Sequence, residues 1–172
     1  KAAYADLMAA AHADAVHGAE ICRDLQDRLV MIARVSDAGA FVNTNALTLK
    51  RSHGDYSVMQ LLYDGSEIKA VLDFVNAGEV PIAWELIRSY SYMDCTFNAA
   101  RLAAYTNEYR RYAEVSMDDL RYMPYLYLGQ LLSSTYGYKQ YLQTGDEELL
   151  AFGRWRTEMC RYLIANAGEV SA

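Results

Sequence analysis

Three oxygen-bearing side chains lie within a short central stretch of this sequence. Asp55 follows His53 and Gly54, Gln60 comes next, and Asp73 lies further along. A positioned carboxylate can accept the proton of a substrate hydroxyl, while a second carboxylate and an amide oxygen can hold Mg²⁺ against nucleotide phosphates. The glycine lets the backbone bend tightly beside the first carboxylate, and the histidine ring can hydrogen-bond loop carbonyls. The set therefore suits phosphoryl transfer.

A small β structure is expected to position these side chains. Short strands are predicted at residues 46–49, 61–63 and 68–72. The first strand delivers the chain to His53. Asp64 and Gly65 predict a tight hairpin between the other two, because both residues tolerate the positive φ that such turns require. Pairing in that hairpin would bring Gln60 and Asp73 close together.

The rest of the chain predicts helices. Two are expected within residues 2–36, with a weak point at His17 and Gly18 and an end near Ser36, and others over 82–93, 98–113, 117–143 and from 146 to 166. Pro81 suits a first helical turn, and Pro124 is expected to kink or start its segment. The predicted fold class is mainly α with a small β-hairpin insertion.

Composition narrows the class of protein. The chain has 172 residues, 53% of them hydrophobic, and a formal net charge of −6. No apolar run approaches the ~18 residues of a membrane span, which predicts a cytoplasmic protein with no membrane partner. The acidic balance argues against nucleic acid as a partner. Three cysteines without metal-site spacing are expected to be reduced, buried thiols.

These motifs together resemble the aminoglycoside phosphotransferase and choline kinase superfamily, whose members are relatives of the protein kinases. The resemblance rests on His53-Gly54-Asp55, on Asp73-Phe74 after the hairpin, and on the downstream residues Ala77, Pro81 and Trp84-Glu85-Leu86. It implies that residues 1–172 form the helical C-terminal lobe of a protein-kinase-like fold. It also implies Asp55 as the catalytic base, with His53 supporting its loop, and Asp73 with Gln60 as ligands for Mg²⁺ and ATP.

Three departures from the family pattern stand out. Gln60 replaces the usual Asn, so its amide oxygen lies one methylene further from the backbone, and Glu85 replaces a common Asp. The N-terminal nucleotide-binding lobe of the family is expected to be absent from this chain, because only Lys1 and Lys50 precede His53 as lysines and no glycine-rich loop precedes it. That missing lobe is therefore an expected partner, and this chain alone is expected to be inactive.

The expected function is transfer of the ATP γ-phosphoryl group to a hydroxyl of a small molecule. Aminoglycosides, choline, homoserine and sugars are candidate acceptors, and the net charge favours a cationic one. One alternative is a non-catalytic binding or structural module that has lost metal binding. Another is a helical interaction domain whose His-Gly-Asp triplet is accidental.

Tyrosines and acidic residues on the helices are secondary candidates for the acceptor site. Eight tyrosines could supply aromatic walls, although at helical spacing they are more typical of core and boundary positions: Tyr90, Tyr92, Tyr122, Tyr125, Tyr127, Tyr136, Tyr138 and Tyr141. Asp94, Asp118 or Asp119 could attract an amine.

Overall fold

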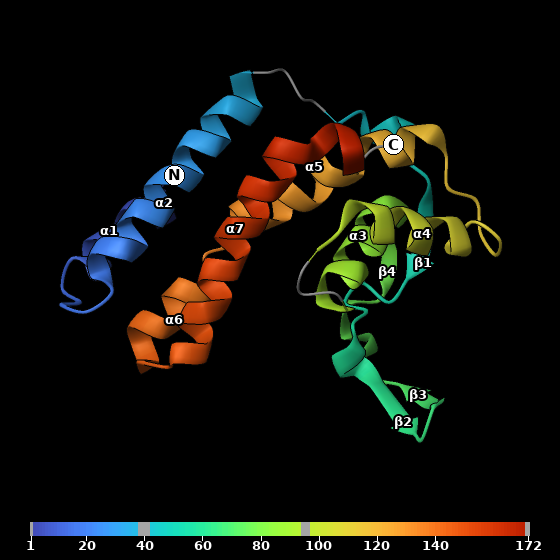
Figure 1. The fold of residues 1–172 in the computed structure, drawn as a ribbon, viewed down its shortest axis with the longest axis horizontal. Coiled ribbons are helices and arrows are strands. Elements are labelled where there is room, and N and C mark those ends of the chain that lie inside the picture. Colours follow the sequence, from blue (N-terminus) through green and yellow to red (C-terminus); the bar gives the residue numbers. More distant parts are fainter. Residues whose placement is uncertain (1, 38–41, 94–96, 171–172) are drawn as a thin grey trace. The chain divides into compact units, whose positions relative to one another are not determined.

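The computed structural model describes residues 2–37, 42–93 and 97–170, and the chain divides into two compact units (Figure 1). The first unit comprises Lys1–Phe41 and Leu128–Asn166, and the second comprises Val42–Tyr127 and Ala167–Ala172. Helices predominate, and the strands form two small sheets. The prediction of a mainly helical chain with a small β hairpin is confirmed.

In the described part of the first unit, all the regular elements are helices. Its helices are α1 (Ala2–Ala11), α2 (Gly18–Asp37), the last part of α5 (Met117–Ser133), α6 (Tyr136–Thr144) and most of α7 (Glu147–Val170). The predicted end of the second helix near Ser36 is confirmed. Gly145 ends α6 with a left-handed φ of 72°, a conformation that glycine adopts without strain.

The prediction of one helical segment over 117–143 is wrong, because the chain leaves the helix after Ser133. Ser and Thr side chains compete with the backbone for hydrogen bonds and disfavour helix interiors. The carbonyl of Ser134 accepts a hydrogen bond from Nη1 of the buried Arg28 at 2.9 Å. Arg28, which is distant in sequence, thus supplies a hydrogen-bond donor to a carbonyl at the point where the helix ends. Pro124 is accommodated inside α5.

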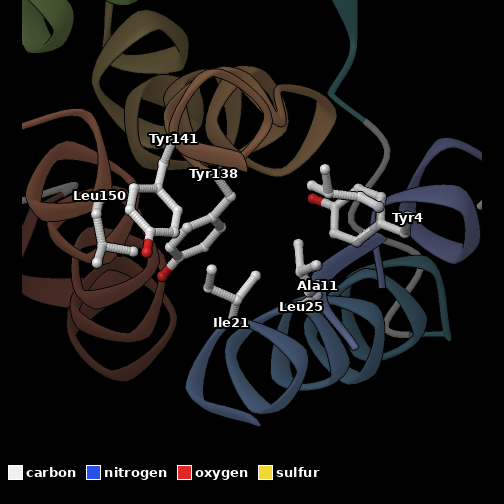
Figure 2. Close-up of a cluster of buried hydrophobic side chains, with 8 residues drawn as sticks. Tyr4, Ala11, Ile21, Leu25, Tyr138, Tyr141 and Leu150 are labelled. Atoms are coloured by element: carbon white, nitrogen blue, oxygen red, sulfur yellow. The ribbon is translucent and has the colours of Figure 1, made fainter. Parts of the chain in front are cut away.

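The core of the first unit joins α1 and α2 to α6 and α7 (Figure 2). Its members are Tyr4, Leu7, Ala11, Ile21, Leu25, Tyr138, Tyr141 and Leu150. α6 and α7 approach closely at two glycines, since a Cβ on Gly137 would lie 2.5 Å from the backbone nitrogen of Gly153. Tyr138 is also anchored by its hydroxyl, which donates to Asp24.

The second unit contains both sheets. Strand β1 (Leu49–Ser52) pairs antiparallel with β4 (Gly78–Pro81), and β2 (Leu61–Asp64) pairs antiparallel with β3 (Glu67–Val71). The hairpin of β2 and β3 is confirmed, with Gly65 at a φ of 59° in its turn. The first strand begins later than predicted, because Thr44–Ala46 form a 3-10 turn capped by Asn43.

Three helices complete the second unit. They are α3 (Ile82–Met93), α4 (Ala99–Tyr109) and the first part of α5. The predicted bounds of α3 are confirmed, with Pro81 immediately before it. Asn98 caps α4, since its side-chain oxygen accepts the Arg101 N–H at 3.1 Å.

Among the described residues, no helix is both long and apolar enough to cross a membrane. Cys160 is a buried free thiol, as predicted, and Cys22 is a free thiol but only half-buried, which the sequence did not predict. Cys95 lies outside the described residues.

Candidate functional site

His53 is the buried centre of the loop that follows β1. Its Nδ1 accepts the backbone N–H of Asp55 at 3.3 Å, and its Nε2 lies 2.6 Å from the carbonyl oxygen of Leu72. Because a carbonyl can only accept, Nε2 carries the proton in this arrangement. The ring also packs against Phe74, with 4.6 Å between ring centroids. His53 therefore ties the loop containing Asp55 to the end of the hairpin, directly before Asp73.

Gly54 permits the tight path of this loop. Its φ is +77°, and a Cβ at this position would lie 2.1 Å from the carbonyl oxygen of Asn76. Both the backbone conformation and the close approach require glycine. The predicted bend beside Asp55 thus has a specific steric cause.

Gln60 and Asp73 lie at the same end of the hairpin. Leu61 pairs with Val71 at the open end of the hairpin. One residue beyond this pair, the Leu72 N–H donates to the Gln60 carbonyl at 2.8 Å. Asp73 follows in the left-handed region, with a φ of 60°, and is exposed. The hairpin register therefore brings these two residues together as the sequence predicted.

Two oxygens in this region suit a magnesium ion bound with nucleotide phosphates. The side-chain oxygen of Gln60 accepts a hydrogen bond from the Ser57 hydroxyl and keeps a second lone pair. Asp73 supplies a carboxylate. The described residues contain no group of three or more His, Cys, Asp or Glu side chains that could hold a metal. A Mg²⁺ held by one or two protein oxygens and by substrate phosphates needs no such group.

Two side chains of helix α3 also hydrogen-bond to this loop. Nη2 of Arg88 donates to the carboxylate of Asp55, and Oε1 of Glu85 accepts the Tyr56 N–H at 3.3 Å. The other carboxyl oxygen of Glu85, Oε2, is buried and has no hydrogen-bond partner within the described part of the chain. Burial raises the pKa of Glu85 above its ordinary value, and its hydrogen bond from Tyr56 and the nearby Arg88 guanidinium oppose this only in part.

Sequence reasoning missed Arg88 and treated Glu85 only as a departure from the family pattern. The signal was present, because the two residues lie one turn apart on a helix that starts directly after the β structure. Their loop partners could not be predicted, since those depend on how α3 packs against residues 53–57.

A cavity of about 320 Å³ lies between this loop, α3 and α4. It is lined in part by Tyr56, Glu85, Ser89, Tyr105 and Tyr109. Burial raises the pKa of each of the three tyrosines. None of them was among the tyrosines that the sequence suggested as ligand walls.

Several of the tyrosines suggested from sequence belong to the core instead. Buried ones are Tyr90, Tyr127, Tyr138 and Tyr141. Asp119 is fully buried, and its carboxylate accepts the N–H groups of Thr48 and Ser116, so it is not placed to attract a soluble amine. Asp118 is exposed, and Asp94 lies outside the described residues.

The chain matches the model of a known family. The model described as the phosphotransferase enzyme family matches residues 5–115, a range that includes His53, Asp55, Gln60, Asp73, Glu85 and Arg88. Searches of curated proteins and of solved structures found no match.

Proposed function

The chain belongs to the phosphotransferase enzyme family, and we propose that it is the C-terminal lobe of a small-molecule kinase with a protein-kinase-like fold. The proposed reaction transfers the γ-phosphoryl group of ATP to a hydroxyl of a small acceptor. Family membership supports a kinase of the phosphotransferase type in general. The residues of the second unit support the more specific assignment.

The observation that supports it best is the double hydrogen bond of His53. One ring nitrogen binds the backbone of Asp55, and the other binds the residue before Asp73. Phosphoryl transfer depends mainly on positioning and on charge stabilisation. A buried ring that joins the segment of the proposed base to that of the proposed metal ligand meets this need.

Asp55 would accept the proton of the acceptor hydroxyl. Gln60 and Asp73 would hold Mg²⁺ together with the phosphates of ATP, and the bound ion would offset their negative charge. The glutamine reaches one methylene further than the asparagine of the family pattern, and its bond to Ser57 gives that longer side chain a fixed direction.

The exposed apolar side chains of the hairpin support the proposal that a nucleotide-binding lobe covers this region. Seven side chains on the hairpin and its flanking turns are between 40% and 88% exposed: Val58, Met59, Leu62, Ile68, Leu72, Phe74 and Val75. The hairpin also projects away from α3 and α4 (Figure 1). Exposed apolar side chains in this number within one short segment suit an interaction surface. Without its partner lobe, the chain is expected to be inactive.

The acceptor is proposed to be a small molecule, with cationic ones favoured. The chain carries a formal net charge of −6, which attracts an amine and repels an anion. Aminoglycosides, choline and other amino alcohols, homoserine and sugars form the set to screen.

The test is a phosphorylation screen of these acceptors with Mg²⁺ and ATP, using the protein with its nucleotide-binding lobe. Asp55→Asn should abolish transfer while leaving Mg²⁺-ATP binding intact, and Asp73→Asn should weaken that binding. Asp64→Asn is the matched control, because Asp64 is an exposed aspartate in the hairpin turn. Failure of the unmodified protein to bind Mg²⁺-ATP would contradict the proposal and favour a non-catalytic module.

A further inference from the structure

Arg88 is a buried cation in direct contact with the proposed catalytic base. Its side chain is only 9% exposed, against 29% for Asp55. Nη2 donates to Oδ1 of Asp55, and Nη1 lies 3.5 Å from the carbonyl oxygen of Tyr56. One guanidinium therefore contacts both the carboxylate and the backbone of the following residue.

Two aromatic rings of the same helix restrict the guanidinium. Trp84 and Tyr92 lie one turn before and one turn after Arg88, and their ring centroids are 5.6 Å and 5.0 Å from its Cζ. A cation at this distance from a ring face is attracted to it. The planar guanidinium presents several N–H donors in a fixed fork, so it can bind the Asp55 carboxylate and the Tyr56 carbonyl at the same time.

The contact also distinguishes the two oxygens of Asp55. Arg88 binds Oδ1, and a carboxylate held by one oxygen presents the other in a fixed direction. In a reaction that depends on alignment of the reacting atoms, displacement by about 1 Å lowers the rate on the order of 10²-fold.

We propose that Arg88 is a positioning residue that holds Asp55 by Oδ1 and so assigns proton acceptance to Oδ2. This inference rests on the proposed function. In the step concerned, the acceptor hydroxyl oxygen forms a bond to the γ-phosphorus of ATP, and its proton passes to Oδ2. The bond from that phosphorus to the bridging oxygen breaks, and ADP leaves with the electron pair.

The first test compares Arg88→Lys with the unmodified protein, nucleotide-binding lobe included. Lysine keeps the charge but is a single point donor that cannot contact the carboxylate and the carbonyl as a planar fork does. We expect kcat to fall on the order of 10²-fold with KM for the acceptor nearly unchanged. Unchanged kcat would overturn the inference.

Arg111→Lys is the matched control. Arg111 also pairs with a carboxylate, that of Glu108, and lies 5.9 Å from the ring centroid of Tyr112, but it is exposed and distant in sequence from the loop. Its substitution should leave kcat unchanged. An equal loss in both variants would show that arginine substitution acts nonspecifically, and would overturn the role of Arg88.

Chemical rescue separates positioning from support of the fold. In Arg88→Ala, added guanidinium should restore part of the lost kcat, because it can occupy the space between the two rings, whereas added ammonium should not. Equal rescue by both cations, or by neither in a folded variant, would overturn the inference. If Arg88→Ala does not fold, Arg88→Lys remains the test.

A measurement without turnover distinguishes this inference from the proposed function. A double-mutant cycle of Asp55→Asn and Arg88→Lys in chemical unfolding should give a coupling energy beyond error, and additive effects would overturn the contact. Absence of transfer by the unmodified protein would instead contradict the proposed function, and with it the role of Arg88 in catalysis. Normal transfer with unchanged kcat in Arg88→Lys would overturn the role of Arg88 alone.

Discussion

The imidazole Nε2 of His53 donates a hydrogen bond of 2.6 Å to the backbone carbonyl of Leu72, which lies nineteen residues further along the chain. The ring is buried and its other nitrogen is also engaged, by the N–H of Asp55. Two separate backbone segments therefore depend on one side chain.

His53→Asn is expected to lower both stability and phosphoryl transfer. Asparagine is too short to bind both segments at once, and each hydrogen bond lost costs about 0.5–1.5 kcal/mol. Chemical unfolding and the transfer assay check the two effects. His12→Asn is the control, because His12 is exposed on the first unit. Equal results for the two variants would contradict the bridging role.

Gly54→Ala is expected to be far more damaging than Gly65→Ala. Both positions have a positive φ, which costs a non-glycine residue about 1–2 kcal/mol. Only at Gly54 would the added Cβ also meet backbone, at 2.1 Å from the Asn76 oxygen; at Gly65 nothing lies within 4 Å. The difference between the two unfolding free energies isolates the steric clash. If the two losses are similar, the loop does not approach Asn76 as described.

Glu85 is expected to make stability fall with rising pH. Burial raises its pKa in the folded state above the ordinary 4.5, so between these two values the folded chain holds a proton that the unfolded chain has released. The stability that Glu85 contributes is therefore fully present below pH 4.5 and is lost as the pH rises through the folded-state pKa.

Glu85→Gln should remove this part of the pH dependence. The amide keeps an oxygen for the Tyr56 N–H and carries no charge. Unfolding free energies measured from pH 4 to pH 8 should show the variant gaining stability relative to the unmodified chain as pH rises. Glu114→Gln, at an exposed position of the same unit, controls for loss of a carboxylate. A difference that does not change with pH would contradict this account of Glu85.

Much of the site's framework could be predicted because its signals are local. The Asp64 and Gly65 turn, flanked by apolar runs, predicts the hairpin without reference to the rest of the chain. The hairpin register then places Gln60 opposite Leu72, next to Asp73. Pro81 marks the start of α3 in the same local way.

The missed features depend on contacts between distant segments. Strand β4 contains Gly78 and Pro81, which are poor strand formers, and it exists because β1 pairs with it. The contact of Arg88 with Asp55 likewise requires α3 to pack against the loop. Neither has a sequence pattern of its own, so tertiary packing decides them.

Asp119 joins the start of α5 to the segment before β1, and its charge is expected to be essential for the second unit. Its carboxylate accepts the Thr48 N–H at 2.9 Å and the Ser116 N–H at 2.8 Å, while the Ser116 hydroxyl oxygen accepts the Asp119 N–H at 3.0 Å. The last two bonds form a reciprocal cap at the helix start. Burial alone would raise the pKa of Asp119, but the hydrogen bonds from Thr48 and Ser116 outweigh it and lower the pKa below the usual 3.8.

The sign of the resulting pH dependence is opposite to that of Glu85. Because the folded-state pKa is lowered, the stability from Asp119 is present above pH 3.8 and is lost as the pH falls through the folded value. Asp119→Asn places an amide N–H₂ against backbone donors and should cost about 1–3 kcal/mol near neutral pH. Asp118→Asn is the matched control, since Asp118 lies in the same first turn of α5 but is exposed. Urea unfolding should show that the loss of unfolding free energy in Asp119→Asn becomes smaller below pH 3.8. If the loss stays the same there, the charge of Asp119 does not stabilise its contacts with Thr48 and Ser116.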